Sequence, residues 1–289
     1  VHICTPNHLH RGPLLSAMAH NKHIYCDKPI VAELSETAPI EAALAQYTGI
    51  AQMTFQNRFF PATRRARQLV EEGFLGRLLQ FRACYLHAGS ADPAAPLKWK
   101  LSAEAGGGVI ADLASHVLDL LHPLVGGYAS VMAATQIAYP DRPSADDPKT
   151  RVKVEAEDNV VILARTRSGA LGTIEATKIA TGAEDELRFE LHGSTGAIRF
   201  NLMDPHHLEI YDATAPGAPP GGRRGWTRIN TGQRDLASGG KPPSSRASTA
   251  SPRPHQDCPP NIPRCLAETP AAHPPLGRSI YLPTITHVF

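Results

Sequence analysis

The sequence predicts an α/β protein in which a short parallel sheet precedes an α+β domain with a mainly antiparallel, open sheet. Two observations support this fold class. Near the amino-terminal end, short apolar runs alternate with helix-like segments, which is the order of strands and helices in a parallel sheet. Beyond about residue 60, long strand-like runs follow one another with few helices between them, and this favours antiparallel pairing.

The first residues carry the short units of the predicted parallel sheet. Val1-His2-Ile3-Cys4 is typical of the end of a buried strand, and a turn then leads into a helix over 9–20. A second short strand covers 23–26. Ser35 is placed to cap the next helix, which ends at Ala45. Two strand-helix units in succession predict parallel strands.

A domain boundary is predicted after a third strand over 49–59. Pro61 fits the first turn of a helix that ends near Gly73. Arg167-Ser168-Gly169 is typical of a hairpin turn. Residues 60–213 therefore form the second domain, with one sheet face covered by a helix and the other open. Its predicted strands lie at 78–87, 131–138, 159–166, 170–179, 187–192 and 197–201.

Residues 214–289 differ in composition from the rest of the chain. Pro, Ser, Arg and Gly dominate there, and large aliphatic residues become rare. Such a segment buries too little apolar surface to offset its ordering entropy, so an irregular tail is predicted. We interpret it as the product of a shifted reading frame, with a native Pro-rich linker as the alternative.

Composition excludes several classes of function. The net charge of +2, without a dense Lys/Arg cluster, argues against nucleic-acid binding. The longest apolar stretch, 106–127, carries Asp112, His116, Asp119 and His122, so no transmembrane segment is predicted. No secretory signal is predicted, and five cysteines without a short paired spacing favour reduced thiols. The predicted location is the cytoplasm.

Acidic and imidazole side chains follow Gly106-Gly107-Gly108 at helical spacing. If the segment is a helix, Asp112, His116 and Asp119 share one face. A carboxylate beside an imidazole can orient the ring and stabilise its charged form, as a general base requires. The alternative is that Asp112 and His116 satisfy each other inside a packed interface. Asp119 is expected to brace neighbouring backbone.

Motifs in a fixed order add a second line of argument. Thr5-Pro6-Asn7-His8, Cys26-Asp27-Lys28-Pro29 and the segment 106–119 together resemble the Gfo/Idh/MocA oxidoreductases, with Asp27 in place of the signature Glu. The resemblance covers about 1–211. It implies an NAD(P)-dependent dehydrogenase that transfers hydride between a nicotinamide cofactor and a secondary alcohol of a sugar, cyclitol or polyol, on a Rossmann-type domain.

The resemblance also assigns roles. Lys28 would reach the nicotinamide ribose and the substrate hydroxyl, and His116 would accept the hydroxyl proton. Asp112 would orient that imidazole or hold the sugar. These residues are the predicted catalytic group. The predicted cofactor contacts are Thr5, Pro6, Asn7, His8, Lys28 and Pro29.

The sequence departs from the family pattern in several places. Relatives begin with a Gly-x-Gly-x-x-Gly turn, which is not found here, so we expect that on the order of 60 to 70 residues of a domain of typical size are missing. The choice between NAD and NADP is unreadable without that segment, and the chain as given is interpreted as a possible inactive fragment. Trp99-Lys100 replaces Trp-Arg, which removes the planar guanidinium fork. Arg58 fits a site or a structural ion pair equally well.

Two other functions remain open. A non-enzymatic oligomerising or binding module would use the open sheet, and in the resembled family that face commonly builds a homo-oligomer, here a dimer or tetramer. A metal centre is the weaker alternative, because no compact set has ligand-like spacing with carboxylate or thiolate partners. Its candidate ligands are His8, His10, His20, His23 and His116.

Overall fold

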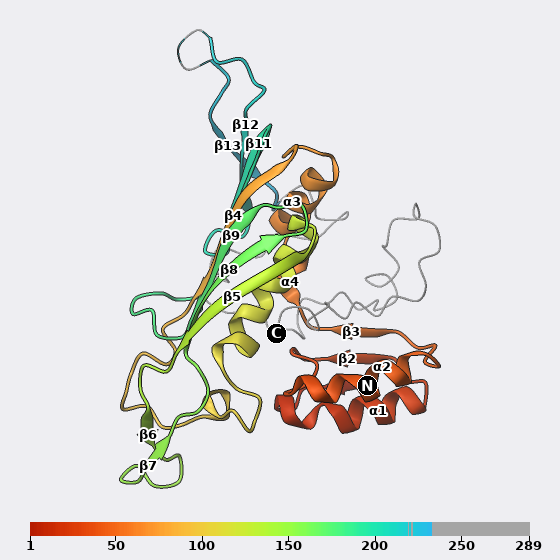
Figure 1. Ribbon diagram of the computed structural model, residues 1–289, viewed down its shortest axis with the longest axis vertical. Helices are drawn as coiled ribbons and strands as arrows, with labels where there is room; N and C mark the ends of the chain where they lie inside the picture. Colours follow the sequence, from red (N-terminus) through yellow and green to blue (C-terminus); the bar gives the residue numbers. More distant parts are fainter. Residues whose placement is uncertain (219, 221, 233–289) are drawn as a thin grey trace.

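The computed structural model describes residues 1–218, 220 and 222–232. Within them, the strand order of the amino-terminal sheet is β1-β2-β3, and both pairings are parallel. Helices α1 and α2 pack on this sheet through a core that includes Ile3, Leu14, Ile24 and Ile40 (Figure 1). The elements are β1 His2–Ile3, α1 Arg11–Ala19, β2 Ile24–Cys26, α2 Thr37–Leu44 and β3 Ala51–Met53.

A longer sheet follows, and its strand order in the described residues is β13-β12-β11-β10-β4-β9-β8-β5. Strands β4 and β9 pair in parallel, and the other pairings are antiparallel. The predicted fold class is therefore confirmed. The strands are β4 Leu78–Leu86, β5 Tyr128–Gln136, β8 Asn159–Thr166, β9 Leu171–Thr177, β10 Glu186–Gly193, β11 Gly196–Asn201, β12 His207–Asp212 and β13 Trp226–Asn230.

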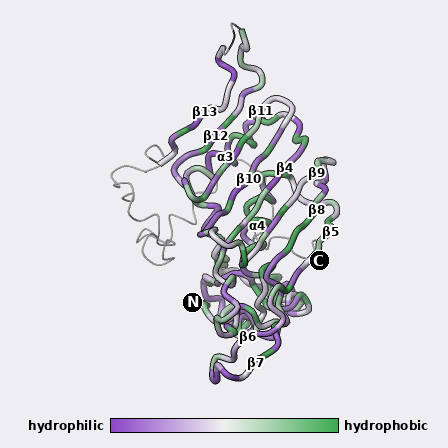
Figure 2. The backbone as a smooth tube through the Cα atoms, turned by 90° about the vertical axis from the view of Figure 1, so that its left-hand side faces the viewer, coloured by the Kyte–Doolittle hydropathy of each residue, from purple (hydrophilic) through white to green (hydrophobic). Residues whose placement is uncertain are grey.

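One face of the long sheet is covered by α3 (Pro61–Glu71) and α4 (Ser115–Val125) (Figure 1). Side chains along β8 alternate between this core and the opposite face, as the period of a strand requires. Figure 2 looks onto that opposite face, where the strands lie in front of α3 and α4. The predicted open face is thus present in the described residues.

The helix predicted around Asp112 has two parts. Residues Ile110–Ala114 form a π-helical turn, and α4 begins only at Ser115. The start of this turn is held by Glu157, whose Oε1 accepts the Ile110 N–H at 2.9 Å. A π turn holds more residues than an α turn, so the side chains before and after it do not keep the predicted α-helical spacing.

Local details differ from the sequence-based prediction near the first domain boundary. The helix cap is not Ser35, because Glu33 and Glu36 form a capping box at a 3-10 turn before α2. The predicted strand over 49–59 is shorter, and Gln56–Phe59 form another 3-10 turn. Phe60 is extended before Pro61, as proline favours, so the 3-10 turn ends there and α3 begins at Pro61.

The structure also adds strands that the sequence did not reveal. A separate hairpin joins β6 (Asp141–Pro143) to β7 (Arg151–Lys153). Strand β13 lies inside the tail predicted as irregular, and that part of the prediction is wrong. It pairs with β12, and the Trp226 ring contacts the tilted Tyr211 ring and lies under the Arg199 guanidinium. The rest of the predicted tail, 233–289, lies outside the described residues.

No helix in the described part of the chain combines the length and apolar composition needed to span a bilayer.

Candidate active site

A cavity of about 270 Å³ opens where the carboxyl ends of β1 and β2 face the turn before α4. Open parallel sheets bind ligands at this edge, because the loops that follow the strands diverge there. The lining residues are Cys4, Thr5, Pro6, Asn7, Asp27, Lys28, Thr54, Gln56, Trp99, Lys100, Gly106, Gly107, Asp112 and His116.

The structure brings the predicted catalytic residues Lys28, Asp112 and His116 together in this cavity. Most of the predicted cofactor contacts line it as well. His8 and Pro29 do not. The His8 ring Nδ1 lies 3.3 Å from the Ala105 carbonyl oxygen, and the Pro29 carbonyl oxygen lies 2.9 Å from a ring nitrogen of His10.

Lys28 is joined to Asp112. Its Nζ lies 2.9 Å from the Asp112 Oδ1 and also donates to the Asp112 carbonyl oxygen. Burial lowers the pKa of Lys28, and the negative charge of Asp112 opposes that shift. The contact therefore couples the loop after β2 to the π-helical turn, and the carboxylate favours the ammonium form of the lysine.

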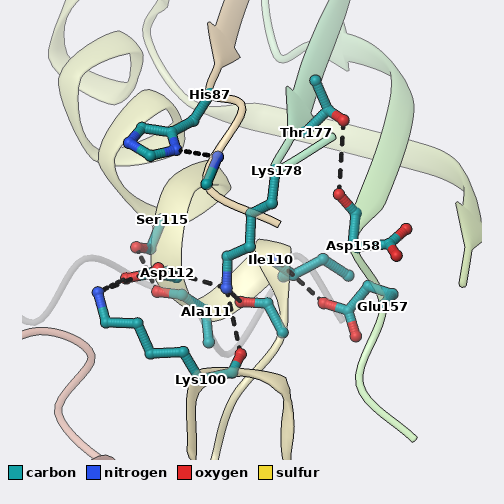
Figure 3. A network of polar contacts seen from close by, with 12 residues as sticks. His87, Lys100, Ile110, Ala111, Asp112, Ser115, Glu157, Asp158, Thr177 and Lys178 are labelled. Carbon is teal, nitrogen blue, oxygen red and sulfur yellow. Dashed lines mark hydrogen bonds and ion pairs between the residues drawn. The ribbon is translucent and has the colours of Figure 1, made fainter. Parts of the chain in front are cut away.

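The Asp112 carboxylate is surrounded by cations. Lys100 Nζ lies 3.1 and 3.2 Å from its two oxygens, and Lys178 Nζ lies 3.3 Å from Oδ2 (Figure 3). Burial alone would raise the pKa of Asp112, but the charges of Lys28, Lys178 and Lys100 lower it well below its ordinary value. Asp112 is consequently ionised at neutral pH and cannot serve as an acid there.

The His116 ring is buried, and its Nδ1 has no hydrogen-bond partner among the described residues. Its ring packs edge-on against Phe55, with the ring centroids 5.6 Å apart. Burial first, and the positive charge of Lys28 second, lower the pKa of His116 to about 3. The imidazole is therefore neutral at pH 7 and available to accept a proton.

The expected hydrogen-bonded pair of Asp112 and His116 does not form in the described structure. The carboxylate is engaged by lysines instead. The π turn also departs from the α-helical spacing on which the expected pair was based. Both residues still line the cavity, so they belong to one site although no hydrogen bond joins their described side chains.

Asn7 ties the two lobes together. Its buried Nδ2 donates to the Gly106 carbonyl oxygen at 2.6 Å. Gly106 has a φ of +72°, and a Cβ there would lie 2.6 Å from the Ala32 Cβ. Only glycine fits such a close approach between segments without displacement.

Asp119 lies on α4 outside the cavity lining. Arg58 Nε donates to its Oδ2 at 2.6 Å, and a second guanidinium nitrogen donates to Oδ1. Of the two interpretations left open for Arg58, the ion pair is the one that forms. It braces the Gln56–Phe59 turn against α4, whereas Asp119 was expected to brace backbone.

Sequence reasoning missed Lys178 and assigned no role to Lys100. Lys178 directly follows β9, and a single lysine at the end of a strand carries no local signal of burial. Lys100 lies over the Trp99 ring at 5.9 Å from the ring centroid while it contacts Asp112. The Trp99-Lys100 pair, which stands where relatives have Trp-Arg, was the feature of the sequence that could have indicated a role for Lys100.

Comparison with known protein families gives two matches. Residues 1–55 match the model described as oxidoreductase family, NAD-binding Rossmann fold. Residues 63–199 match the GFO/IDH/MocA C-terminal domain.

Curated relatives agree with these matches. Levoglucosan dehydrogenase of Pseudarthrobacter phenanthrenivorans is 35% identical over 246 residues, which cover 80% of this chain and 62% of that protein. Inositol 2-dehydrogenase of Rhizobium meliloti is 26% identical, covering 75% of this chain and 62% of the relative. The chain thus spans about three fifths of the length of these relatives.

Solved structures carry the same architecture. Levoglucosan dehydrogenase in complex with NADH and levoglucosan superposes with a TM-score of 0.75 at 35% identity, covering 80% of this chain and 61% of that one. An oxidoreductase domain protein from Kribbella flavida gives a TM-score of 0.78 at 34% identity, covering 85% of this chain and 65% of that one. Both sheets, the cavity between them and both family matches lead to one conclusion: the chain belongs to the Gfo/Idh/MocA family of oxidoreductases.

Proposed function

We propose that this chain carries the catalytic residues of an NAD(P)-dependent dehydrogenase that acts on a secondary alcohol of a sugar, cyclitol or polyol. The observation that carries the proposal is the convergence of Lys28, Asp112 and His116 on one cavity. Relatives named for levoglucosan and inositol support this substrate class.

The cavity edge formed by the loops after β1 and β2 fits a nicotinamide cofactor. Thr5, Pro6, Asn7 and Lys28 line this edge, and we assign the cofactor contacts to them. Gly107 lines the opposite side of the cavity, and a Cβ there would lie 2.6 Å from the Lys100 backbone, so the close approach of these two cavity-lining segments requires glycine. When bound, the nicotinamide ring accepts or supplies the hydride. His8 and Pro29 then support these loops from outside the cavity.

Each catalytic residue has a defined task in this proposal. The Lys28 ammonium donates a hydrogen bond to the substrate oxygen, while Asp112 holds the lysine in place. The neutral His116 ring accepts the hydroxyl proton. Its low pKa suffices for this step, because the hydroxyl becomes a protonated carbonyl as the hydride leaves, and that group is a far stronger acid than an imidazolium ion.

Substitution of His116 tests the proposal. NADH or NADPH formation is followed with levoglucosan, myo-inositol and D-xylose as substrates. His116→Ala is expected to lower kcat by roughly 100- to 10,000-fold, the range of general base catalysis, with the Kd for NADH changed less than about twofold. His20→Ala, at an exposed histidine, is the control. Unchanged turnover in His116→Ala would refute the assigned role.

The open sheet face supports a second part of the proposal, a homodimer or homotetramer. Apolar side chains on this face of β5, β8 and β9 are strongly exposed: Met132 by 67%, Val161 by 46%, Leu163 by 50% and Leu171 by 53%. Met132 pairs with Leu163 across the strands. An exposed apolar patch of this kind favours an interface. If this face assembles while no cofactor binds, the non-enzymatic module is the better description.

The place of the reaction stays a prediction from sequence. Cys4, Cys26 and Cys84 are free thiols in the structure, in keeping with a reducing compartment such as the cytoplasm.

A further inference from the structure

Lys178 is a buried lysine beside the cavity. It follows β9 directly, and its backbone N–H donates to the Asp158 carbonyl oxygen at 2.8 Å. Its side chain is only 6% exposed. From this position the Nζ lies 3.3 Å from Asp112 Oδ2, 3.3 Å from the Gly108 carbonyl oxygen and 3.2 Å from the Lys100 carbonyl oxygen (Figure 3).

These contacts use the full capacity of the side chain. An ammonium group has three N–H donors and no acceptor, and three oxygens of the described residues surround this one. A buried charge is costly unless it is paired and hydrogen-bonded. The oxygens come from the turn that carries Trp99, from the turn before the π helix and from Asp112 itself. The lysine therefore connects the long sheet to the segments that shape the cavity.

Different lysines contact the two carboxylate oxygens of Asp112, and this indicates what Lys178 does. Lys178 contacts Oδ2, whereas Lys28 contacts Oδ1. Lys100 contacts both oxygens, but its side chain is half exposed to solvent. Of the two largely buried lysines on this carboxylate, Lys28 therefore holds Oδ1 and Lys178, directly after β9, holds Oδ2.

We propose that Lys178 is a positioning residue, which holds the Asp112 carboxylate so that Oδ1 is presented to Lys28. This inference rests on the proposed dehydrogenase function. It assigns Asp112 to the support of the catalytic lysine and not to the orientation of His116. Lys178 itself does not line the cavity and does not touch the substrate.

A double-mutant cycle tests whether Lys178 acts through Asp112. Lys178→Met removes the charge with a side chain only one heavy atom shorter, and Lys178→Gln retains an amide donor for the carbonyl oxygens. Loss of a hydrogen bond to a charged group corresponds to roughly a 10- to 100-fold effect, and we expect kcat to fall by this factor in Lys178→Met. In an Asp112→Asn background, the same substitution should lower kcat less than about threefold.

Matched variants separate positioning from simple loss of folding. Lys153→Met makes the same change at an exposed lysine of β7 and should leave kcat and thermal unfolding as in the parent chain. Lys178→Gln should lose most of the activity that Lys178→Met loses, because the charge is absent in both. An equal loss in the presence and absence of the Asp112 carboxylate would overturn the proposal, and so would full activity of Lys178→Gln.

A spectroscopic measurement decides the matter independently of turnover. In ¹⁵N-lysine-labelled protein, Lys178→Met identifies the Nζ signal of Lys178. We expect that signal to be protected from exchange and to shift in Asp112→Asn, whereas the Lys153 signal stays in place. A Lys178 signal unaffected by Asp112→Asn overturns the inference. Lack of turnover of the unsubstituted chain with every sugar tested counts instead against the proposed function.

Discussion

The single residue with the most unusual surroundings is His116, because its ring is buried next to a cationic site. Burial and the nearby Lys28 charge each disfavour the protonated ring, so the imidazole is neutral. The role of proton acceptor then requires no carboxylate partner. This differs from the sequence-based hypothesis, in which a carboxylate stabilises a charged ring.

This environment predicts how stability depends on pH. The pKa of His116 falls from 6.5 to about 3 on folding, so the unfolded chain binds more protons between these values. The contribution of the neutral His116 ring to the free energy of unfolding is therefore present above pH 6.5. It is lost as the pH falls toward 3, at up to about 1.4 kcal/mol per pH unit. In His116→Gln, the free energy of unfolding in urea should therefore fall less steeply over this window than in the parent chain.

His20→Gln serves as the control for this measurement, because His20 is exposed at the end of α1. It should keep the slope of the parent chain. Identical slopes for His116→Gln and the parent between pH 6.5 and 4 would mean that the ring is not held neutral by burial.

At the scale of elements, the π turn at Ile110–Ala114 decides the geometry of the site. The spacing of Asp112, His116 and Asp119 was interpreted on the basis of a helix here, and a π turn followed by α4 is present. The inserted π turn carries no local signal in the sequence, and Glu157, which accepts the Ile110 N–H at its start, comes from a distant segment. Consequently the sequence indicated that Lys28, Asp112 and His116 share a site, but not which of them contact each other.

The same distinction applies to the strands. β8 and its hairpin turn at Gly169 were predicted from alternation and turn residues, which are local signals. The short strand β13 was missed, because Trp226 gains its partners from β11 and β12. Elements with a strong local period are predictable, whereas short edge strands depend on their neighbours.

The turn at Gly106 gives a prediction at this scale. Gly106→Ala would strain a left-handed backbone and press a Cβ against Ala32 and Asn7. Backbone strain of this kind costs about 1–3 kcal/mol, and the contact adds displacement of the Asn7 loop. We expect lower stability in urea unfolding and weaker NADH binding.

Gly182→Ala provides the matched comparison, because Gly182 also has a positive φ but its added Cβ would meet no atom within 4 Å. It should show the backbone strain alone and bind NADH as the parent chain does. Equal effects of the two substitutions would show that the contact between Asn7 and Gly106 does not shape the cavity.

At the scale of the whole molecule, the cavity and the open sheet face lie in separate places. The cavity lies at the carboxyl ends of the strands of the small sheet. The exposed apolar side chains lie on the face of the long sheet away from α3 and α4, and Figures 1 and 2 show how this sheet and these helices are arranged. Assembly through this face would leave the site accessible.

Leu163→Glu tests that assembly. A buried, unpaired carboxylate opposes association, so the variant should elute as a smaller species in light scattering coupled to gel filtration. Thr173→Glu, at the position opposite Leu163 on β9, places a charge on the same face and should act in the same direction. Ser168→Glu, in the hairpin turn, is the control that should keep the parent mass. A parent chain that is monomeric at all concentrations would contradict the proposed oligomer.

The most direct test of the dehydrogenase site follows the hydrogen that is transferred. A sugar or cyclitol deuterated at the reacting carbon is incubated with the protein and NAD⁺ or NADP⁺, and the reduced nicotinamide is analysed by mass spectrometry. We predict deuterium in the nicotinamide ring, and its loss in Lys28→Met and His116→Ala. Reduced nicotinamide without deuterium, or equal transfer by those variants, would contradict the account.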